Sequence, residues 1–497
     1  MRKINVLTWV AASLLAACGG SSNPTDGGAG DGGAGDAAVA PGIGLAIPCS
    51  DPLEDLYKTP AMLPAFDDGR RGEVVRCAKD RRLSAMEVNE ALKAAGYVGD
   101  PLPYGVTIYK AVYRTVRVTS GKGPKDGLSA ALILLPDETK LPTGLVVAGH
   151  GSVGLGPQCG PSREDQLAKS STHTMNLAVA ASGLITIAPD YAGLGYGATH
   201  GWSLAEDEAH SVLDATRAMK RLLKPENAPA KVVLVGHSQG GHAVLSAQAW
   251  AGRYGLEGSL VGVVGMAPLW LPGRTWGAAL SPLAGLNTKE SPGPIGYSMI
   301  YFYGHGELYD GDGAGVRPFA PAKQKAIKDL LATSCLDDVY NKVKNFGDTP
   351  ADIYDPAFLG PIAGCSISDR CDAEPAKTWV KRMNDDRPPL DGAGAPVVVF
   401  QGRADGTISP DRAQCGFEKM QRDLKKVAMA KATLTLCGDK EATHGSVIER
   451  NMAWVVKWAT ARLGGGPEPA ACTTIDALKP DGGGDLTCPG LPPNDKD

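Results

Sequence analysis

At roughly 100–200 residues per domain, a chain of 497 residues predicts two to four domains. Hydrophobic residues make up 43% and charged residues 21%, which excludes a chain that is disordered throughout. The 50 Lys and Arg against 54 Asp and Glu give a net charge of −4, without the basic excess of a nucleic-acid-binding protein. No apolar run reaches the roughly 18 residues that a membrane-spanning helix needs.

The first 18 residues predict a lipoprotein signal peptide. Arg2 and Lys3 precede a short apolar stretch, and residues 15–18 read LAAC, which resembles the bacterial lipobox. In such sequences the cysteine is lipidated, and Gly19 in place of Asp favours sorting to the outer membrane. We therefore expect a lipid anchor at Cys18 and a protein attached to the membrane of the cell envelope. The alternative is an ordinary secretory signal and an extracellular protein.

Two segments have the composition of irregular chain. Residues 19–42 repeat Gly, Ala and Asp, so we expect a flexible linker that buries little apolar surface. Residues 464–497 are again rich in Gly and Pro but contain Cys472 and Cys488, and form the expected C-terminal tail.

Ten cysteines remain besides Cys18, and no CxxC pair occurs, which argues against zinc-ribbon and thioredoxin-type sites. In an oxidising compartment an even number favours five disulfides. The sequence does not determine their connectivity. The favoured local pairs are Cys472–Cys488, Cys415–Cys437 and Cys365–Cys371.

From residue 106 onward, apolar strands alternate with helices. In chain order we expect strands over 106–118, 128–135 and 145–148, a helix over 164–182, strand 184–188, helix 204–223, strand 231–235, helix 239–251, strands 260–266 and 397–400, helix 411–425, strand 432–436 and helix 446–463. Strands that read as continuous Val, Ile and Leu runs are typical of a parallel sheet covered on both faces. The predicted fold class is α/β.

A long interval interrupts this alternation and divides the expected fold. Residues 43–266 form the first part of the core and residues 395–463 the second part. The segment 267–394 between them is too long for a loop in a compact domain. We expect it to be an inserted cap subdomain over the carboxyl ends of the strands, where ligands bind in such folds.

The pattern G-x-S-x-G occurs where strand 231–235 runs into helix 239–251. Gly236 and Gly240 leave room for a sharp turn, which would expose Ser238 at the start of the helix. This strand–turn–helix setting predicts that Ser238 is a catalytic nucleophile. The alternative is a serine that merely caps the helix.

A serine nucleophile needs a neighbouring base. His237 and His242 flank the serine but lie on the wrong side of the turn to act as its base. His444 follows the last predicted strand and precedes the C-terminal helix, which fits the chain order Ser…Asp…His. We therefore expect His444 to be the base.

The acid that orients this histidine should follow the penultimate strand. Asp405 comes five residues after that strand ends, in the sequence GRADGTISP. Asp411 and Asp439 are the competing carboxylates, and the alternative for Asp405 is a simple turn residue. We expect Asp405 to complete the triad.

An oxyanion needs two N–H donors. One is expected on Gln239, directly after the nucleophile. The other should come from the loop that follows strand 145–148, on either Gly151 or Ser152. The sequence contains neither an HExxH motif nor a metal-ligand cluster, so we expect no metal and no cofactor.

Residues 145–461 resemble an α/β-hydrolase and are similar to the secretory lipase family. The resemblance rests on DYAGLG at 190–195, GHSQGG at 236–241, GRADGTISP at 402–410 and THG at 443–445. It implies hydrolysis of small-molecule or lipid esters through an acyl-enzyme, with a helical cap that contributes the acyl pocket. Asp190 would be structural rather than catalytic.

Two other functions compete with this interpretation. One is a serine peptidase or aminopeptidase on the same fold, and the other is a catalytically silent surface binding protein. An intact set of Ser238, Asp405 and His444 favours catalysis. The aromatic run Tyr297–Tyr303, followed by Tyr309, either fills the core of the cap or lines an acyl pocket for short to medium chains.

Overall fold

The structure is a computed structural model that describes residues 43–60, 63–118, 125–164, 171–270, 280, 292–368, 371–391, 394–427 and 432–473. The predicted signal peptide, its Cys18, the linker 19–42 and Cys488 lie outside these residues. Among the described helices, none combines the length and the apolar character that crossing a bilayer requires.

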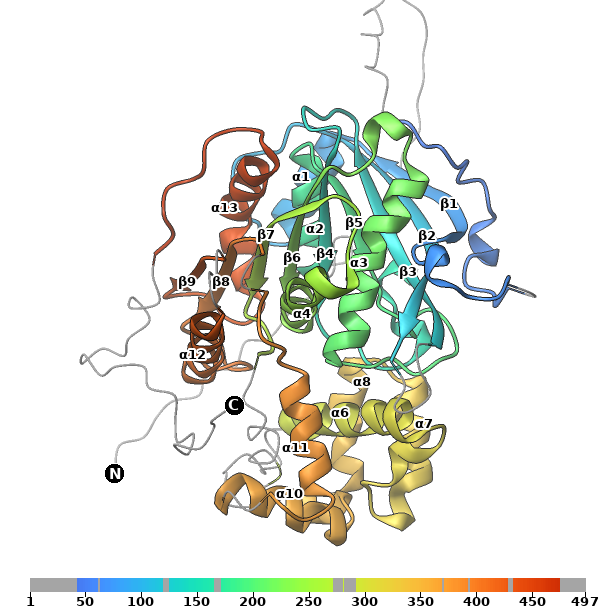
Figure 1. Cartoon of the computed structure of the whole chain (residues 1–497), viewed down its shortest axis with the longest axis vertical. Coiled ribbons are helices and arrows are strands. Elements are labelled where there is room, and N and C mark those ends of the chain that lie inside the picture. The colour runs from blue at the N-terminus through green and yellow to red at the C-terminus, as the bar shows by residue number, and fades with distance from the viewer. Residues whose placement is uncertain are drawn as a thin grey trace, which may run out of the picture. The chain divides into compact units, whose positions relative to one another are not determined.

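In the described residues, nine strands form one mixed sheet in the order β1-β2-β3-β5-β4-β6-β7-β8-β9 (Figure 1). The strands are β1 (Val74–Leu83), β2 (Val106–Arg117), β3 (Lys125–Pro136), β4 (Gly144–Gly149), β5 (Ile185–Pro189), β6 (Lys231–His237), β7 (Ser259–Met266), β8 (Val397–Gly402) and β9 (Leu434–Asp439). Pairing is antiparallel from β1 to β5 and parallel from β5 to β9. The predicted α/β class with a mostly parallel sheet is confirmed.

Helices cover both faces of this sheet. The core helices are α1 (Ala85–Ala94), α2 (Ser171–Ala181), α3 (Ala205–Leu222), α4 (Gln239–Tyr254), α12 (Pro410–Lys426) and α13 (Ser446–Leu463). Strand β4 shows why two layers are needed. Its Val146 belongs to the cluster on the side of α2 and α13, whereas the next residue, Val147, belongs to the cluster on the side of α3 and α4. Buried side chains on both faces explain the uninterrupted apolar runs of the sequence.

Strand β1 and helix α1 precede the first element predicted from the sequence, and both were missed. Strand β1 lies at the edge of the sheet and carries Lys79, Asp80, Arg81 and Arg82 in succession. Charged residues are common on edge strands because they discourage pairing with other chains. They also remove the apolar alternation by which a strand is recognised.

Between β7 and β8 the chain forms a helical segment, drawn in yellow and orange in Figure 1. Its described helices are α6 (Pro292–Asp310), α7 (Gln324–Thr333), α8 (Leu336–Lys342), α9 (Pro350–Ile353), α10 (Pro356–Ser368) and α11 (Ala376–Asp385). We call residues 267–394 the insert. Tyr301 and Phe302 of α6 are buried in a hydrophobic cluster made mostly by the insert, with Leu155 and Trp202 from outside it, so these two rings help to hold the insert together and to seat it.

The disulfides confirm one local pairing and correct two. Cys365–Cys371 forms as predicted. The pairings Cys415–Cys437 and Cys472–Cys488 are wrong, because Cys437 is bonded to Cys472. Strand β9 and the start of the tail lie side by side, with Gly438 N donating to Thr473 O, and this non-local contact sets the pairing. Two further bridges join Cys49 to Cys77 and Cys159 to Cys335.

Candidate active site

Ser238 occupies a strained turn between β6 and α4. Its φ of 55° and ψ of −117° lie where L-residues are rarely found, at a cost of about 1–3 kcal/mol that the surrounding packing must offset. A Cβ on Gly236 would come 2.1 Å from Gly240 O, and one on Gly240 would come 2.0 Å from Gly149 O. Only glycine permits this close crossing of strand and helix.

The structure brings Ser238, His444 and Asp405 together. His444 Nε2 lies 2.9 Å from Ser238 Oγ, and His444 Nδ1 lies 2.8 Å from Asp405 Oδ2. Both distances are those of hydrogen bonds. The serine and the aspartate are almost fully buried, at 6% and 3% exposure. The three residues come from the ends of three parallel strands, β6, β8 and β9.

Asp405 is held by its own turn. Its Oδ1 accepts hydrogen bonds from Thr407 N and Ile408 N, both at 2.8 Å, and Gln401 Nε2 donates to its Oδ2 at 3.1 Å. The competing Asp439 binds Arg450 instead, at 2.9 Å from its Nε. Of these two carboxylates, Asp405 is therefore the one that the structure places on the histidine. The side chain of the other competitor, Asp411, lies outside the described part of the structure.

His237 fixes the backbone of His444. Its Nε2 lies 2.7 Å from His444 O, and the two rings are 4.7 Å apart. Burial, together with repulsion from His444, lowers the pKa of His237 to about 3. The ring is therefore neutral at physiological pH and donates its Nε2 proton to this carbonyl oxygen.

Gln239 and the loop that carries Gly151 and Ser152 lie beside the serine. Gln239 is the first residue of α4, where leading N–H groups have no partner within the helix. A Cβ on Gly151 would lie 3.7 Å from Ser238 Cβ, so the loop after β4 passes directly beside the turn. The next residue, Ser152, accepts a hydrogen bond at its Oγ from Trp202 Nε1 at 2.8 Å.

Trp202 was not identified from the sequence. Its ring is buried and stacks on Tyr297 of α6 at a centroid distance of 5.5 Å. Trp202 lies in the loop between β5 and α3, some 50 residues from Ser152, and no local motif marks this pairing. The stack forms an aromatic wall on the loop that carries the candidate oxyanion donors.

Asp190 and Tyr191, in the DYAGLG motif, support the same loop. Asp190 accepts hydrogen bonds from Ser162 N at 3.0 Å and Ser162 Oγ at 2.5 Å. Tyr191, with a φ of 66°, donates from its hydroxyl to His150 O at 3.0 Å. The structure thus places Asp190 behind the loop rather than at Ser238, in accord with the structural role expected for it.

The insert is fastened to the same loop. The disulfide Cys159–Cys335 joins the loop to the connection between α7 and α8. Gly154 forms an isolated antiparallel bridge with Cys335, and Leu336 N donates to Val153 O at 2.9 Å. A covalent bond and backbone pairing therefore fix one corner of the insert next to Gly151 and Ser152.

Asp386 joins the other side of the insert to the core. It is buried, and its carboxyl oxygens contact Ala205 N at the start of α3 and the Tyr301 hydroxyl, at 3.1 and 2.7 Å. Burial raises the pKa of Asp386 to about 7, although the bond from Tyr301 and the attraction of His242 oppose that rise.

Asp386 should make the stability of the protein pH-dependent. Because its pKa is higher in the folded chain than the usual value near 4, folding favours the protonated carboxyl. That contribution is complete below pH 4 and is lost as the pH rises through about 7, by up to about 4 kcal/mol. The free energy of unfolding, wild type minus Asp386→Asn, should fall between pH 5 and pH 8 in urea titrations.

The exposed neighbour Asp385 supplies the control for this measurement, since its ion pair among the described residues is with Lys381 along the same helix. The difference between wild type and Asp385→Asn should stay constant over that pH range. A constant difference for Asp386→Asn as well would contradict the assignment.

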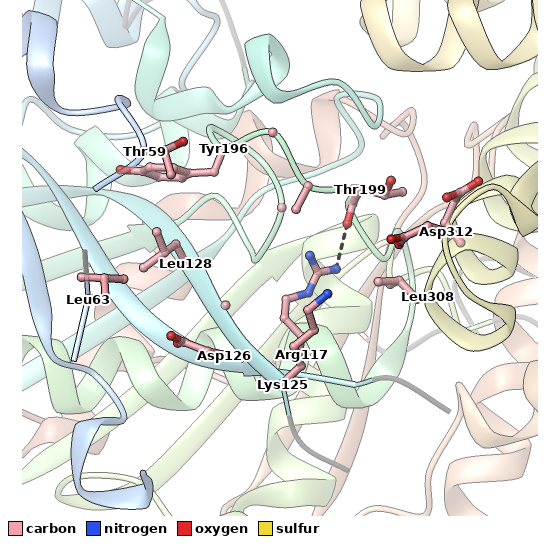
Figure 2. A pocket seen from close by; sticks show the side chains of 15 residues that line it. Thr59, Leu63, Arg117, Lys125, Asp126, Leu128, Tyr196, Thr199, Leu308 and Asp312 are labelled. Carbon is pink, nitrogen blue, oxygen red and sulfur yellow. Dashed lines mark hydrogen bonds between the residues drawn. The ribbon is translucent and has the colours of Figure 1, made fainter. Parts of the chain in front are cut away.

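A separate cavity of about 620 Å³ lies at the edge of the sheet where β2 ends and β3 begins (Figure 2). Because β3 runs antiparallel to β5, the cavity lies at the same end of the sheet as the carboxyl ends of the parallel strands. Its wall includes Arg117, Lys125, Tyr196 and Leu308 but none of the triad residues. The Arg117 guanidinium donates to Thr199 O at 2.8 Å, drawn as a dashed line, and its charge is paired with Asp207.

Residues 165–270 match the model of the secretory lipase family. No curated protein matches the chain. Among solved structures, a putative hydrolase from Legionella pneumophila is 17% identical with a TM-score of 0.60, covering 78% of this chain and 98% of its own. The rice cell wall degrading esterase LipA from Xanthomonas oryzae is 18% identical with a TM-score of 0.57, at 79% and 97% coverage.

Candida antarctica lipase A in its closed state is 17% identical with a TM-score of 0.59, covering 89% of this chain and 94% of its own. At these identities the likeness establishes the fold. The chain has the α/β-hydrolase fold, and over residues 165–270 it resembles the secretory lipase family.

Proposed function

We propose that the protein is a serine hydrolase that cleaves carboxylic esters through an acyl-enzyme. The observation that carries this proposal is the hydrogen-bonded chain from Ser238 through His444 to Asp405 at the strained turn. The match to the secretory lipase family and the likeness to an esterase and a lipase support esters as substrates.

In the first half of the reaction, Ser238 Oγ attacks the ester carbonyl carbon and His444 Nε2 takes the serine proton. Asp405 holds the ring through Nδ1 and stabilises the imidazolium that forms. The carbonyl oxygen becomes an oxyanion, which accepts hydrogen bonds from Gln239 N–H and from Gly151 or Ser152 N–H. His444 then protonates the leaving alcohol, and the acyl group remains on Ser238.

In the second half, water replaces the alcohol. His444 accepts a proton from the water, whose oxygen attacks the acyl carbon, and then returns that proton to Ser238 Oγ as the carboxylic acid leaves. The same three residues thus serve both halves without a cofactor.

We propose that the insert acts as a cap and that the acyl group lies against its aromatic wall. Tyr297 of the insert is half-buried and stacks on the buried ring of Trp202, which is bonded to Ser152, so Tyr297 is the ring of this stack that offers apolar surface to the acyl group. We expect a preference for short to medium acyl chains. Each further CH₂ adds about 0.8 kcal/mol of binding only if it is buried, and a chain longer than the aromatic wall leaves its last CH₂ groups in water.

The test is hydrolysis of p-nitrophenyl acetate, butyrate, octanoate and palmitate beside aminoacyl p-nitroanilides. We expect ester turnover that is highest at butyrate or octanoate, with no anilide turnover. A fluorophosphonate should label one site, and peptide mapping should locate the adduct on Ser238. Anilide turnover would favour a peptidase instead, and no turnover with no label would favour a silent binding protein.

We further propose that the enzyme is exported and lipid-anchored at Cys18. The lipobox LAAC at residues 15–18 and the disulfides of the chain support this location, because disulfides persist in oxidising compartments. Through the anchor the protein would contact the membrane, and residues 19–42 would tether the enzyme to it.

Cys18→Ser should release the protein from the membrane fraction without changing kcat, because only the anchor is lost. Intact-mass analysis of the wild-type protein should show a lipidated N-terminus at Cys18. An unmodified N-terminus upstream of Cys18 would contradict the anchor while leaving the proposed chemistry untouched.

A further inference from the structure

Behind the turn that carries Ser238 lies a buried ion pair that the reaction does not use. Glu208 of α3 and His242 of α4 are 0% and 2% exposed, and Glu208 Oε2 lies 2.7 Å from His242 Nδ1. A buried pair adds little net stability compared with apolar residues of the same volume. The role of this pair is therefore to be sought in the groups that Glu208 and His242 hold in place, rather than in the stability that the pair adds.

Glu208 holds the side chain of Gln239. Its Oε1 accepts hydrogen bonds from Gln239 Nε2 at 2.7 Å and from Ser203 N at 2.8 Å. The second amide hydrogen of Gln239 points to His200 Nε2, also at 2.7 Å. Burial lowers the pKa of His200 well below its usual value, so this nitrogen is free to accept. Both donors of the Gln239 amide are thus used, which fixes its orientation.

His242 uses both ring nitrogens as donors. Nδ1 faces the Glu208 carboxylate, and Nε2 lies 2.7 Å from Asp386 O. Two acceptors on one ring require the imidazolium form. Burial opposes that charge, but the attraction and hydrogen bond of Glu208, with help from Asp386, outweigh it and raise the pKa of His242.

The insert completes this arrangement. Asp386 follows α11 of the insert, and its backbone oxygen binds His242 while its carboxyl reaches Ala205 N, at the start of the helix that carries Glu208. Tyr301 of α6 donates to the same carboxyl. A shift of the insert would therefore remove a partner from His242 and from the first turn of α3 together.

We propose that Glu208 and His242 are positioning residues that tie the oxyanion donor Gln239 to the seating of the insert. The inference rests on the proposed function, since it assumes that Gln239 N–H binds the oxyanion. With the insert in place, the charged His242 ring fixes the Glu208 carboxylate. That carboxylate in turn binds the Gln239 side-chain amide, which keeps the Gln239 backbone N–H directed at the oxyanion. The pair acts on the reaction only through Gln239.

Glu208→Gln tests the first link. It preserves the shape but presents an amide to His242 and removes the charge. A lost oxyanion donor costs roughly 10²- to 10³-fold in kcat, so a misaligned one should cost about 10- to 100-fold, with KM nearly unchanged. The rate of fluorophosphonate labelling at Ser238 should fall in parallel.

The pH profile separates positioning from simple packing. The titratable and charged groups that face His242 are Glu208 of α3, Asp386 and Arg387 after α11, and Tyr301 and His305 of α6. Burial lowers the pKa of His305 to about 3, so it carries no charge in the neutral range. Asp386, with a pKa of about 7, contributes an ionisation in the wild type already. Without the Glu208 charge, His242 should lose its proton between pH 5 and pH 8, and kcat in Glu208→Gln should gain a further ionisation.

His242→Asn and His242→Gln test the two hydrogen bonds of the His242 ring separately. An Asn amide places a donor near the position of Nδ1, and a Gln amide places one near Nε2. His242→Asn should therefore keep the Glu208 contact and lose the Asp386 contact, and His242→Gln should do the reverse. Both should lower kcat about 10-fold or more if seating of the insert and alignment of Gln239 are coupled.

Asp423→Asn is the matched control, because it breaks the buried Lys419–Asp423 pair of α12 in the same way. It should change the melting temperature but not kcat per fluorophosphonate-labelled site. Wild-type kcat per labelled site in Glu208→Gln, or in both His242 variants, would overturn the inference. Absence of Ser238-dependent ester turnover in the wild type would instead overturn the proposed function, so the two failures are distinguishable.

Discussion

Ser238→Ala should abolish ester hydrolysis, with kcat lower by roughly 10⁴- to 10⁶-fold and KM nearly unchanged. The alanine removes the atom that bonds the acyl group, whereas the surfaces that bind the ester stay in place. His444→Ala should cost a similar factor, and the double variant should be hardly worse than either single one. Residues that act as one unit do not contribute additively. Single-turnover and steady-state rates with p-nitrophenyl butyrate measure all three variants.

Ser246→Ala is the control for this series. Ser246 is buried on the same helix, α4, two turns beyond the nucleophile, so its replacement removes a hydroxyl from the same structural setting. It should leave kcat within a factor of about two, because Ser246 takes no part in the proposed reaction and only the local packing of α4 changes. Retention of substantial turnover by Ser238→Ala would show that another residue is the nucleophile.

Gly240→Ala should prevent the protein from folding to its native state. The added methyl carbon would lie 2.0 Å from Gly149 O and 2.7 Å from His150 O, both backbone atoms that cannot rotate away. Strand β4 and helix α4 would have to separate, and a loss above about 4 kcal/mol is expected from such a backbone conflict. Soluble yield, thermal melting and fluorophosphonate labelling measure the effect.

The matched control is Gly364→Ala in α10, where nothing outside the residue's chain neighbours and its own helix backbone lies within 4 Å of the added carbon. This substitution should stabilise the protein by about 0.5–1 kcal/mol, because alanine loses less conformational entropy in a helix than glycine does. A folded and fully labelled Gly240→Ala enzyme would mean that the close crossing at the turn is not required.

The triad residues could be found from the sequence because each follows a strand that is recognisable by itself. G-x-S-x-G joins two strong local signals, and Asp405 and His444 lie in the short loops that follow apolar runs. Glu208 and His242 gave no such signal. Glu208 lies 34 residues from His242, and the third member, Asp386, is 144 residues from it. Only the packing of three separate segments reveals their contact.

Two other features could not be predicted from the sequence, for different physical reasons. The charge-rich edge strand β1 lacks the apolar alternation that predicts a strand. The pairing of Cys437 with Cys472 depends on where the tail leaves α13, whereas proximity in sequence favoured Cys415 and Cys488 as partners. The aromatic run of α6 was recognised, but its rings divide between the insert's core, as for Phe302, and the wall near Ser152, as for Tyr297.

The disulfide between Cys159 and Cys335 closes a covalent ring of backbone, and Ser238 lies within it. Asp405 and His444 follow the ring in the chain and are attached to it through Cys335. A protease that cuts once anywhere between these two cysteines therefore opens the ring without dividing the molecule. Such a nicked enzyme should migrate as one species without reductant and as two with it, and its nucleophile stays covalently joined to its base.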